Sequence, residues 1–327
     1  MTANTFLSDR QKDSVNITVL GECMIELSGK PLNPLTQRFS GDTLNTAIYL
    51  RRLLDTQSCK VHYATALGTD AFSKAMLNEW QKENIDCSLV RQYEGKAPGL
   101  YYIELDQQGE RSFSYWRSDS AAKQYLERDG WEVFEQKILH HQLLYLSGIS
   151  LAILPLASRD KLFDMVQNLR RNGGKVAFDN NYRPLLWRNK SEAVLEYERF
   201  LSECDLALLT FDDEKQLYGE INESRVLERC EKLGVAELVI KRGAEPAIVQ
   251  CLCPGQNTRS YEVSAQKVKN VIDTTAAGDS FSGAYIAARI LGRDSKTAAN
   301  WGHTLASTVI GHHGAIIDKK FMPEFKA

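Results

Sequence analysis

The chain has 327 residues, of which 43% are hydrophobic and 25% are charged, and its formal net charge is −2. This composition supports a large buried core, in one big α/β domain or in two ordinary domains. The absence of a basic cluster argues against a nucleic-acid partner, and the longest apolar runs are too short to cross a bilayer.

The N-terminal segment, Met1 to Asn16, is polar and of mixed charge, and it lacks the apolar core of a signal peptide. We therefore expect a frayed leader on a cytoplasmic protein. The seven cysteines, an odd number at irregular spacing, do not form the pattern of a disulfide framework. Cys251 and Cys253 alternate along a strand-like run without a second Cys/His pair at zinc spacing, so we expect them to pack.

Strand-like and helix-like patterns then alternate along the chain. Strand patterns occupy residues 17–21, 61–67, 143–146, 175–178, 206–209 and 238–241. Helical spacing of apolar residues occupies residues 42–54, 72–83, 159–171, 214–218 and 226–233. This alternation predicts an α/β protein with a mostly parallel sheet that is covered by helices on both faces.

Two segments, residues 22–39 and 100–116, break this alternation with period-two patterns and no intervening helix. The second predicts an antiparallel hairpin with a turn at 107–110 and aromatic residues on both faces. We expect the two segments to form a small β-sheet that projects from the α/β body. No Pro/Gly/Ser-rich linker, low-complexity tract or internal repeat divides the chain.

Clusters of polar residues follow several of the predicted strands. They lie at 179–184, 210–214 and 241–244, and a fourth follows the apolar pair at 271–272. Ligands of an open parallel sheet bind outside the carboxyl ends of its strands. Four such clusters in one half of the chain, with both signs of charge, indicate a phosphate and metal site.

The most informative of these clusters is DTTAAGD at residues 273–279. It places small residues where a loop turns into a helix, and the free N–H groups of a helix start attract anions. A carboxylate at such a site would be repelled by the anion, so Asp279 indicates a proton acceptor for a hydroxyl that attacks a phosphate. The glycine signatures of P-loop enzymes and of dinucleotide-binding proteins are absent from the sequence.

Residues 273–279 resemble the second signature of the ribokinase/PfkB family of carbohydrate kinases. Further stretches resemble the subgroup of this family that phosphorylates 2-keto-3-deoxy-D-gluconate, and they lie at 21–27, 41–46, 98–104, 115–117, 145–150 and 178–184. The resemblance covers nearly the whole chain. It implies a single domain over residues 1–327, with a Rossmann-like αβα sandwich (the ribokinase-like fold) and a small β-sheet lid formed by about 22–40 and 98–118.

The resemblance also implies roles for individual residues, with ATP and Mg²⁺ as cofactors. Asp279 matches the catalytic base, and the anion hole matches Ala276, Ala277 and Gly278. The segment that holds the sugar hydroxyls matches Gly41, Asp42, Thr43, Leu44 and Asn45. The nucleotide and its phosphates are implied to lie near Asn181, Arg183, Lys241, Arg242 and Gly243.

The lid residues that close over the sugar match Tyr101, Tyr115 and Arg117. Their neighbour Trp116 fits either contact with the sugar or packing within the hairpin. The residue types agree with an acidic sugar, because a planar guanidinium holds a carboxylate through two parallel hydrogen bonds. Arg117 and Arg183 are the candidates for this contact, and Arg183 also matches a position near the phosphates.

Three positions depart from the wider family. Ala276 stands where glycine is usual, so the loop has to suit a residue with a Cβ. Thr210-Phe211-Asp212-Asp213 stands where Asn-x-x-Glu is frequent near the metal; Asp213 could bind Mg²⁺ through water, and no metal ligand is assigned. His303 falls where an Asn often lies near the adenine.

The sequence thus predicts an enzyme that transfers phosphate from ATP to the primary hydroxyl of 2-keto-3-deoxy-D-gluconate, giving 2-keto-3-deoxy-6-phosphogluconate, with Asp279 as general base. A kinase of a neutral sugar, such as a fructokinase or a ribokinase-like enzyme, is the alternative. A sugar sensor without activity and a nicotinamide oxidoreductase are weaker alternatives. Because the small sheet has an unpaired edge and aromatic faces, we expect a homo-oligomer that pairs through the lid.

Overall fold

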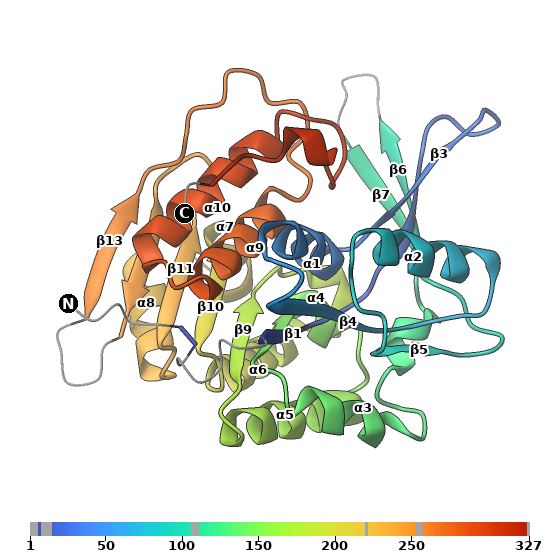
Figure 1. Ribbon diagram of the computed structural model, residues 1–327, viewed down its shortest axis with the longest axis horizontal. Coiled ribbons are helices and arrows are strands. Elements are labelled where there is room, and N and C mark those ends of the chain that lie inside the picture. Colours follow the sequence, from blue (N-terminus) through green and yellow to red (C-terminus); the bar gives the residue numbers. More distant parts are fainter. Residues whose placement is uncertain (1–5, 8–14, 106–110, 220–221, 253–257, 326–327) are drawn as a thin grey trace.

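The computed structural model describes residues 6–7, 15–105, 111–219, 222–252 and 258–325 (Figure 1). Within these residues the strands form a large sheet of nine strands and a small sheet of four. Helices cover both faces of the large sheet, and the small sheet projects from one side of this body (Figure 1). The predicted α/β sandwich with a smaller projecting sheet is confirmed.

The large sheet has the order β13-β12-β11-β10-β9-β8-β1-β4-β5. Its strands are β1 (Val15–Leu20), β4 (Cys59–Leu67), β5 (Val90–Gln92), β8 (Leu143–Ser147), β9 (Lys175–Asp179), β10 (Leu206–Thr210), β11 (Glu237–Lys241), β12 (Ala247–Cys251) and β13 (Arg259–Val263). All neighbours from β5 to β11 run parallel, whereas β12 is antiparallel to both of its neighbours, β11 and β13. The carboxyl ends of seven strands therefore meet at one edge.

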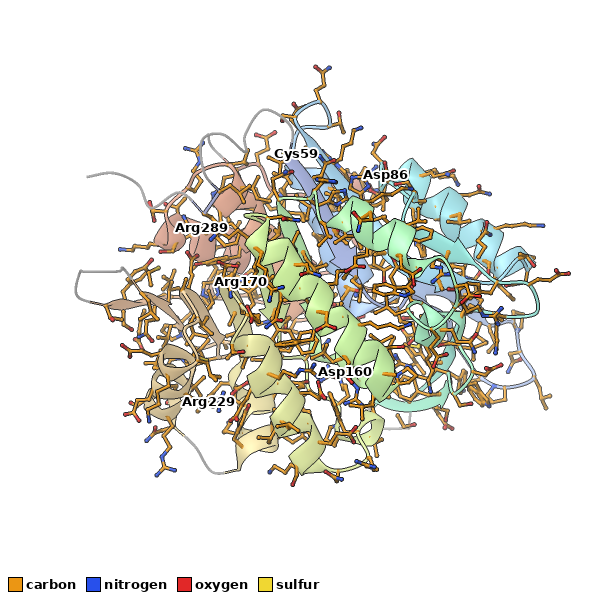
Figure 2. The ribbon with its side chains drawn as sticks, turned by 90° about the horizontal axis from the view of Figure 1, so that it is seen from below. Cys59, Asp86, Asp160, Arg170, Arg229 and Arg289 are labelled. Atoms are coloured by element: carbon orange, nitrogen blue, oxygen red, sulfur yellow. The ribbon has the colours of Figure 1, made fainter. Side chains whose placement is uncertain are left out.

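Helices on opposite faces of the sheet close two separate apolar cores. One face carries α1 (Asp42–Leu53), α2 (Ala71–Lys82), α9 (Ala277–Ile290) and α10 (Ser295–Val309), which bury side chains such as Tyr49, Trp80 and Phe281. The other carries α3 (Trp131–Ile138), α4 (Gly148–Ala152), α5 (Leu156–Arg171), α6 (Lys190–Leu201), α7 (Phe211–Tyr218) and α8 (Glu223–Lys232). Figure 2 shows this second layer from below, with α5 crossing the face of the sheet.

A buried ion pair ties α9 to the sheet beneath it. Arg289 Nη2 lies 2.9 Å from Glu237 Oε2, and the Tyr285 hydroxyl donates to Glu237 Oε1 at 2.5 Å. All three side chains are almost fully buried. Burying a charge is costly unless it is paired and hydrogen-bonded, and here both conditions are met. The first residue of β11 is thereby joined to the last turn of α9.

The small sheet has the order β3-β2-β6-β7, made of β2 (Met24–Ser28), β3 (Thr36–Ser40), β6 (Leu100–Leu105) and β7 (Arg111–Trp116). Tyr101 lies opposite Tyr115 on the β6–β7 pair, and their rings, with that of Phe113, gather on one face. Trp116 is 61% exposed and belongs to the opposite face, as alternation along a strand requires. The turn predicted at 107–110 lies outside the described residues.

The prediction of a frayed leader is wrong for the described residues of the N-terminal segment. Val15 and Asn16 belong to β1, and Phe6 and Leu7 are 8% and 1% exposed. The guanidinium of Arg289 lies over the Phe6 ring at 5.9 Å from its centroid. Two adjacent apolar side chains outweigh the polar residues around them, because burying each favours folding by roughly 1.5–3 kcal/mol.

The remaining predictions on packing and compartment are met in part. Cys23, Cys59, Cys87, Cys204 and Cys230 are free thiols, and Cys253 lies outside the described residues. No helix among the described residues is long and apolar enough to cross a membrane. The cytoplasmic location stays a prediction.

Candidate active site

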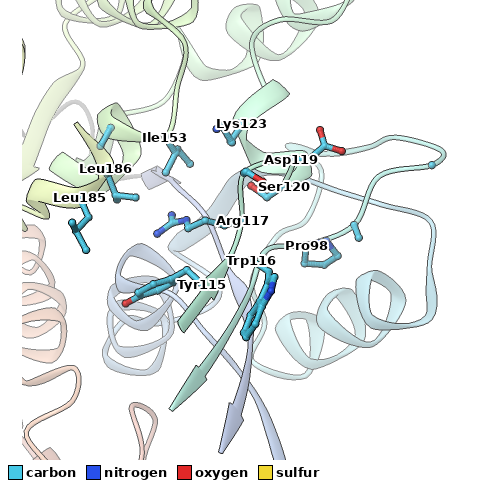
Figure 3. Close-up of a pocket in the computed structure, with 14 residues that line it drawn as sticks. Pro98, Tyr115, Trp116, Arg117, Asp119, Ser120, Lys123, Ile153, Leu185 and Leu186 are labelled. Carbon is cyan, nitrogen blue, oxygen red and sulfur yellow. The ribbon is translucent and has the colours of Figure 1, made fainter. Parts of the chain in front are cut away.

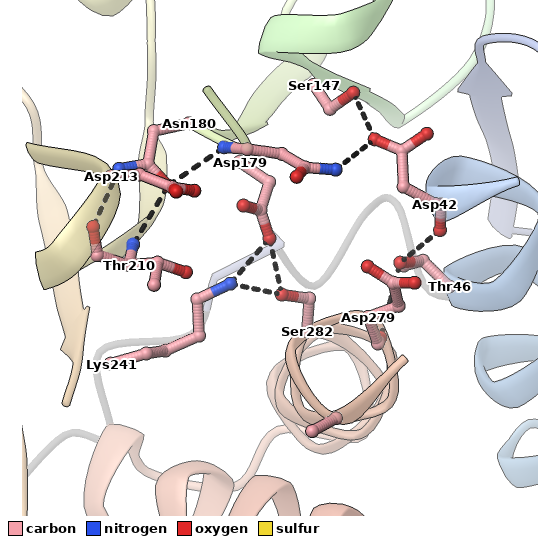
Figure 4. Close-up of polar contacts among 12 residues, drawn as sticks. Asp42, Thr46, Ser147, Asp179, Asn180, Thr210, Asp213, Lys241, Asp279 and Ser282 are labelled. Carbon is pink, nitrogen blue, oxygen red and sulfur yellow. Dashed lines mark hydrogen bonds and ion pairs between the residues drawn. The ribbon is translucent and has the colours of Figure 1, made fainter. Parts of the chain in front are cut away.

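Polar side chains from the carboxyl ends of the strands and from two helix starts meet above the large sheet (Figure 4). Helix α1 supplies Asp42, Asn45 and Thr46, helix α9 supplies Asp279 and Ser282, and the strand ends supply Ser147, Asp179 and Lys241. The structure thus brings together residues that lie far apart in the sequence, as expected for the edge where parallel strands end.

Asp279 lies in the first turn of α9, beside the N-terminus of α1. Asn45 Nδ2 donates to Asp279 Oδ2 at 2.8 Å, and the Thr46 hydroxyl donates to the Asp279 carbonyl at 3.2 Å. Burial, and then the nearby negative charge of Asp42, raises the pKa of Asp279 to about 7. A carboxylate with such a pKa can accept a proton near neutral pH.

Asn45 also offers a free acceptor to a ligand. Its Oδ1 atom is buried and has no hydrogen-bond partner among the described residues, while its amide N–H is used by Asp279. Since buried polar atoms are nearly always paired, this oxygen is suited to a sugar hydroxyl. The placement agrees with the predicted role of Asn45.

The loop before α9 contains the unusual Ala276. This residue is the N-cap of the helix and has φ +59° and ψ +16°, the left-handed region that costs an L-residue roughly 1–2 kcal/mol. Asp273 holds the loop, because its carboxylate accepts from Thr275 N and Gly314 N, both at 2.9 Å. The loop therefore has the backbone conformation usual for glycine at this position, although the residue is an alanine.

Lys241 lies at the end of β11 and forms a buried ion pair with Asp179 at 2.7 Å. Ser282 of α9 donates to the same carboxylate oxygen at 2.9 Å. A Cβ on Gly278 would lie 3.5 Å from Lys241 Nζ, so the lysine is adjacent to the start of α9. A cation beside the free N–H groups of a helix start is an arrangement suited to an anion.

Asp42 links the sugar segment to two neighbouring loops. Its Oδ2 atom accepts from Ser147 Oγ at 2.5 Å and from Asn181 Nδ2 at 2.7 Å. Asn181 has φ +29°, in the left-handed region that Asn tolerates better than most residues. These bonds place the predicted nucleotide residue Asn181 beside the predicted sugar residue Asp42.

Two members of the predicted sugar segment face away from the site. The Leu44 side chain is 1% exposed and belongs to the core below α1, so contact of Leu44 with substrate stays a prediction for its backbone alone. The Thr43 hydroxyl is buried against the Tyr63 hydroxyl at 3.1 Å. On a helix, consecutive residues point in different directions, and only part of the segment can face the ligand.

The small-sheet residues border a pocket of about 640 Å³ whose other side carries Ile153, Leu185 and Leu186 (Figure 3). Figure 3 shows Tyr115 and Arg117 directed toward the side of the pocket that carries Leu185, while Trp116 lines another part of it. Tyr101 is buried and donates to Glu26, while Tyr115 is about half exposed. Tyr115 and Arg117 are therefore placed to contact a ligand in this pocket, and Trp116, which also lines it and is 61% exposed, keeps both alternatives.

Arg183 lies at the mouth of the site. Its Nη1 atom donates to the Tyr182 carbonyl at 2.8 Å and lies 3.6 Å from Asp213 Oδ1, and its side chain is 51% exposed. Burial raises the pKa of Asp213 to about 6, an effect that Arg183 opposes. The guanidinium is thus held near the site, with donors left for an anion.

The side chains of two further residues are committed elsewhere. Arg242 donates to Pro246 O and to Glu223 and Glu262, so its guanidinium is not brought to the network. His303 is buried, with its Nε2 atom 3.0 Å from Val263 O and its ring edge-on to Phe281. Surface ion pairs explain the position of the Arg242 side chain, and packing explains that of His303.

Asp179, Ser147 and Ser282 were missed as site residues in the sequence. Asp179 opens a polar cluster at a strand end and Ser147 lies in the resembling stretch 145–150, which were available signals, whereas Ser282 was not singled out. The partners of the two serines lie 105 and 103 residues away, Asp42 for Ser147 and Asp179 for Ser282. Spacing in a sequence does not reveal such pairs.

Comparison with known proteins gives consistent matches. The model of the family described as pfkB family carbohydrate kinase matches residues 15–321. The chain is 48% identical over 312 residues to the 2-dehydro-3-deoxygluconokinase of Escherichia coli K12, covering 95% of this chain and 99% of that one. It is 49% identical over 310 residues to the enzyme of that name from Dickeya dadantii, covering 94% and 98%.

Among solved structures, a putative ribokinase II from E. coli in complex with ATP and Mg²⁺ has a TM-score of 0.77. The identity is 21%, and the match covers 92% of this chain and 94% of that chain. At this identity the likeness supports the fold.

Proposed function

Because the chain belongs to the pfkB family of carbohydrate kinases, we propose that it transfers the terminal phosphate of ATP to 2-keto-3-deoxy-D-gluconate. The product is 2-keto-3-deoxy-6-phosphogluconate. The substrate follows from relatives named 2-dehydro-3-deoxygluconokinase that align over nearly the full chain. The single observation that carries the mechanism is the Asp279 carboxylate, held by Asn45 at the start of α9, with its pKa raised to about 7.

Asp279 accepts the proton of the primary hydroxyl as the hydroxyl oxygen attacks the phosphorus atom. Asn45 fixes the carboxylate with its N–H and accepts a hydrogen bond from the sugar with its free oxygen. The N–H groups at the start of α9 and the ammonium of Lys241 stabilise the negative charge on the transferred group. Asp42, held by Ser147 and Asn181, contacts the sugar hydroxyls.

Arg117 and Arg183 hold the substrate carboxylate, and Tyr115 packs against the sugar. The small sheet acts as a lid that excludes water, which would otherwise hydrolyse ATP. This assignment rests on the half-exposed Tyr115 and on Arg117 at the wall of the pocket.

A magnesium ion fits this site only as a partner of the nucleotide. No group of three or more His, Cys, Asp or Glu side chains suited to a metal occurs among the described residues. Mg²⁺ usually takes one or two carboxylates, waters and substrate phosphates, and Asp213, with its raised pKa, is the carboxylate that would approach it through water. When bound, the ion neutralises phosphate charge.

The proposed function is tested with an assay that couples ADP release to a spectroscopic signal. The panel contains 2-keto-3-deoxy-D-gluconate, its galactonate epimer, fructose and ribose. We expect kcat/KM to be highest for one of the keto-sugar acids, and an Asp279→Asn variant supplies the background rate. Efficient turnover of fructose or ribose, with no preference for an acid, would identify a kinase of a neutral sugar instead.

We also propose that two copies pair through the small sheet. Phe113 and Tyr115 are 47% and 48% exposed on one face, and large apolar side chains that gather on a surface often mark an interface. Strands β3 and β7 are the edges of this sheet and are open to pairing.

A further inference from the structure

A buried carboxylate, Glu22, lies where the small sheet joins the body. It follows β1 directly after Gly21, and its side chain is 1% exposed. Its ion-pair partner is Arg117, which follows β7 and has a side chain that is 10% exposed. The pair therefore joins the end of a central strand to the end of the small-sheet hairpin.

The second oxygen of this carboxylate faces the other root of the hairpin. Glu22 Oε1 is buried without a hydrogen-bond partner among the described residues. A Cβ on Gly99, just before β6, would lie 2.9 Å from this oxygen and 3.1 Å from Arg117 Cβ. Glycine at this position leaves the ion pair the room that it occupies, so three chain segments meet at one pair of charges.

Arg117 has further donors that this pair does not use. Only Nη2 contacts Glu22, and no other carboxylate or carbonyl among the described residues accepts from the guanidinium. Arg117 also lines the pocket beside Tyr115. A guanidinium carries five N–H donors in a rigid fork, so binding one acceptor leaves donors for a second.

We propose that Glu22 is a positioning residue that fixes Arg117, so that the unused donors of the guanidinium meet the carboxylate of the sugar acid. This inference rests on the proposed function and extends it to a residue that does not touch the substrate. A free arginine side chain has many rotamers, and it loses this conformational entropy on binding. An arginine that is already held by a buried partner loses less, which strengthens substrate binding.

A competing effect has the opposite sign. Glu22 also neutralises Arg117, and a neutralised cation attracts a substrate carboxylate less strongly. If attraction decided the outcome, removal of the Glu22 charge would tighten binding. Positioning and neutralisation therefore predict changes of KM in opposite directions.

The test uses Glu22→Gln, which keeps the size of the side chain and removes its charge. We expect KM for 2-keto-3-deoxy-D-gluconate to rise about 10-fold or more, equivalent to about 1.4 kcal/mol, while KM for ATP stays near the wild-type value. The matched control is Glu83→Gln, which breaks a comparable pair with Arg52 on the far side of α1. This control should leave both KM values unchanged.

A double-mutant cycle with Arg117→Ala shows whether Glu22 acts through the arginine. In the Arg117→Ala background, Glu22→Gln should leave KM for the sugar acid unchanged, because there is no guanidinium left to position. Isothermal titration of the Asp279→Asn protein with the sugar acid measures binding without turnover. Adding Glu22→Gln to this protein should weaken binding by the same factor.

Three results would overturn the inference: a lower KM in Glu22→Gln, an undiminished effect of Glu22→Gln when Arg117 is absent, or a parallel rise of both KM values. A thermal melt shows whether a parallel rise of both KM values comes with loss of folding. If it does, Glu22→Asp, which keeps the charge, should restore stability without raising KM for the sugar acid alone. Failure of the proposed function is separate, because it would appear as wild-type protein that does not phosphorylate the sugar acid.

Discussion

At the scale of single residues, the site contains two residues in energetically unfavourable states that the surrounding structure maintains. Asp279 is close to Asp42 and buried, which disfavours its charge, and Ala276 adopts a backbone conformation that favours glycine. Strained or unfavourable states of this kind tend to be retained where they serve function. Both features lie at the N-terminal end of α9.

Replacing Asp279 by Asn should lower kcat by about 10²–10⁴-fold, the usual contribution of a general base. Binding of ATP should be retained, because Asn keeps the size of the side chain. Rapid-quench measurement of phosphate transfer checks the rate, and titration calorimetry checks binding. Near-normal turnover would remove Asp279 from the mechanism.

The raised pKa of Asp279 predicts how activity and stability depend on pH. The carboxylate must be deprotonated to accept a proton, so kcat/KM should rise through an apparent pKa of about 7. The folded-state pKa is above the usual value, so the charged group lowers stability above that usual pKa, and the full cost is reached only above pH 7. In thermal melts Asp279→Asn should therefore be more stable than wild type at pH 8 and equal to it at pH 4; the reverse order would contradict the assigned shift.

Ala276→Gly should stabilise the protein by up to about 1 kcal/mol, because relief of the left-handed strain exceeds the entropy lost with glycine. Ala276→Val should do the opposite and also reduce kcat, since a β-branched side chain is unsuited to positive φ. Urea unfolding of the two variants gives the comparison. Equal stability of all three proteins would mean that the loop relaxes out of this conformation.

At the scale of elements, the predicted strands and helices are found within a few residues of their observed ends, because apolar periodicity reports which face of an element is buried. The small sheet was also predictable from its period-two pattern. The network of Asp42 with Ser147 and Asn181 was not, since these bonds depend on how the strand ends meet in space. The direction of Leu44 was missed because a motif names a segment and not the side chains that face the ligand.

The exposed face of the small sheet leads to a prediction about assembly. Phe113→Glu places a charge among Phe113, Tyr115 and Tyr101 and should shift the protein from dimer to monomer in analytical ultracentrifugation. The exposed Leu32, on the loop between β2 and β3, supplies a control, and Leu32→Glu should leave the dimer intact. A monomeric wild-type protein would contradict pairing through this sheet.

At the scale of the whole molecule, Phe6 and Leu7 join the core from outside the regular elements. Leu7→Ala should lower the free energy of unfolding by roughly 2–4 kcal/mol, because a buried Leu leaves a cavity when it is truncated. The kcat value should not change, since Leu7 is remote from the site residues. Urea titration measures the loss, and Leu185→Ala, at a side chain that is 94% exposed, should show almost none.

The tie between Glu237 and Arg289 has a mechanical consequence for the chemistry. Glu237 and Lys241 are the two ends of β11, while Arg289 and Asp279 lie near the two ends of α9. Strand β11 and helix α9 are joined at both ends. The Glu237–Arg289 ion pair joins one end, and the contacts among Lys241, Asp179 and Ser282 join the other, so the two elements form one rigid unit. We expect Asp279 and Lys241, the proposed proton acceptor and phosphate-binding residue, to keep a constant separation, so that any motion that admits sugar or releases product occurs where the small sheet joins the body.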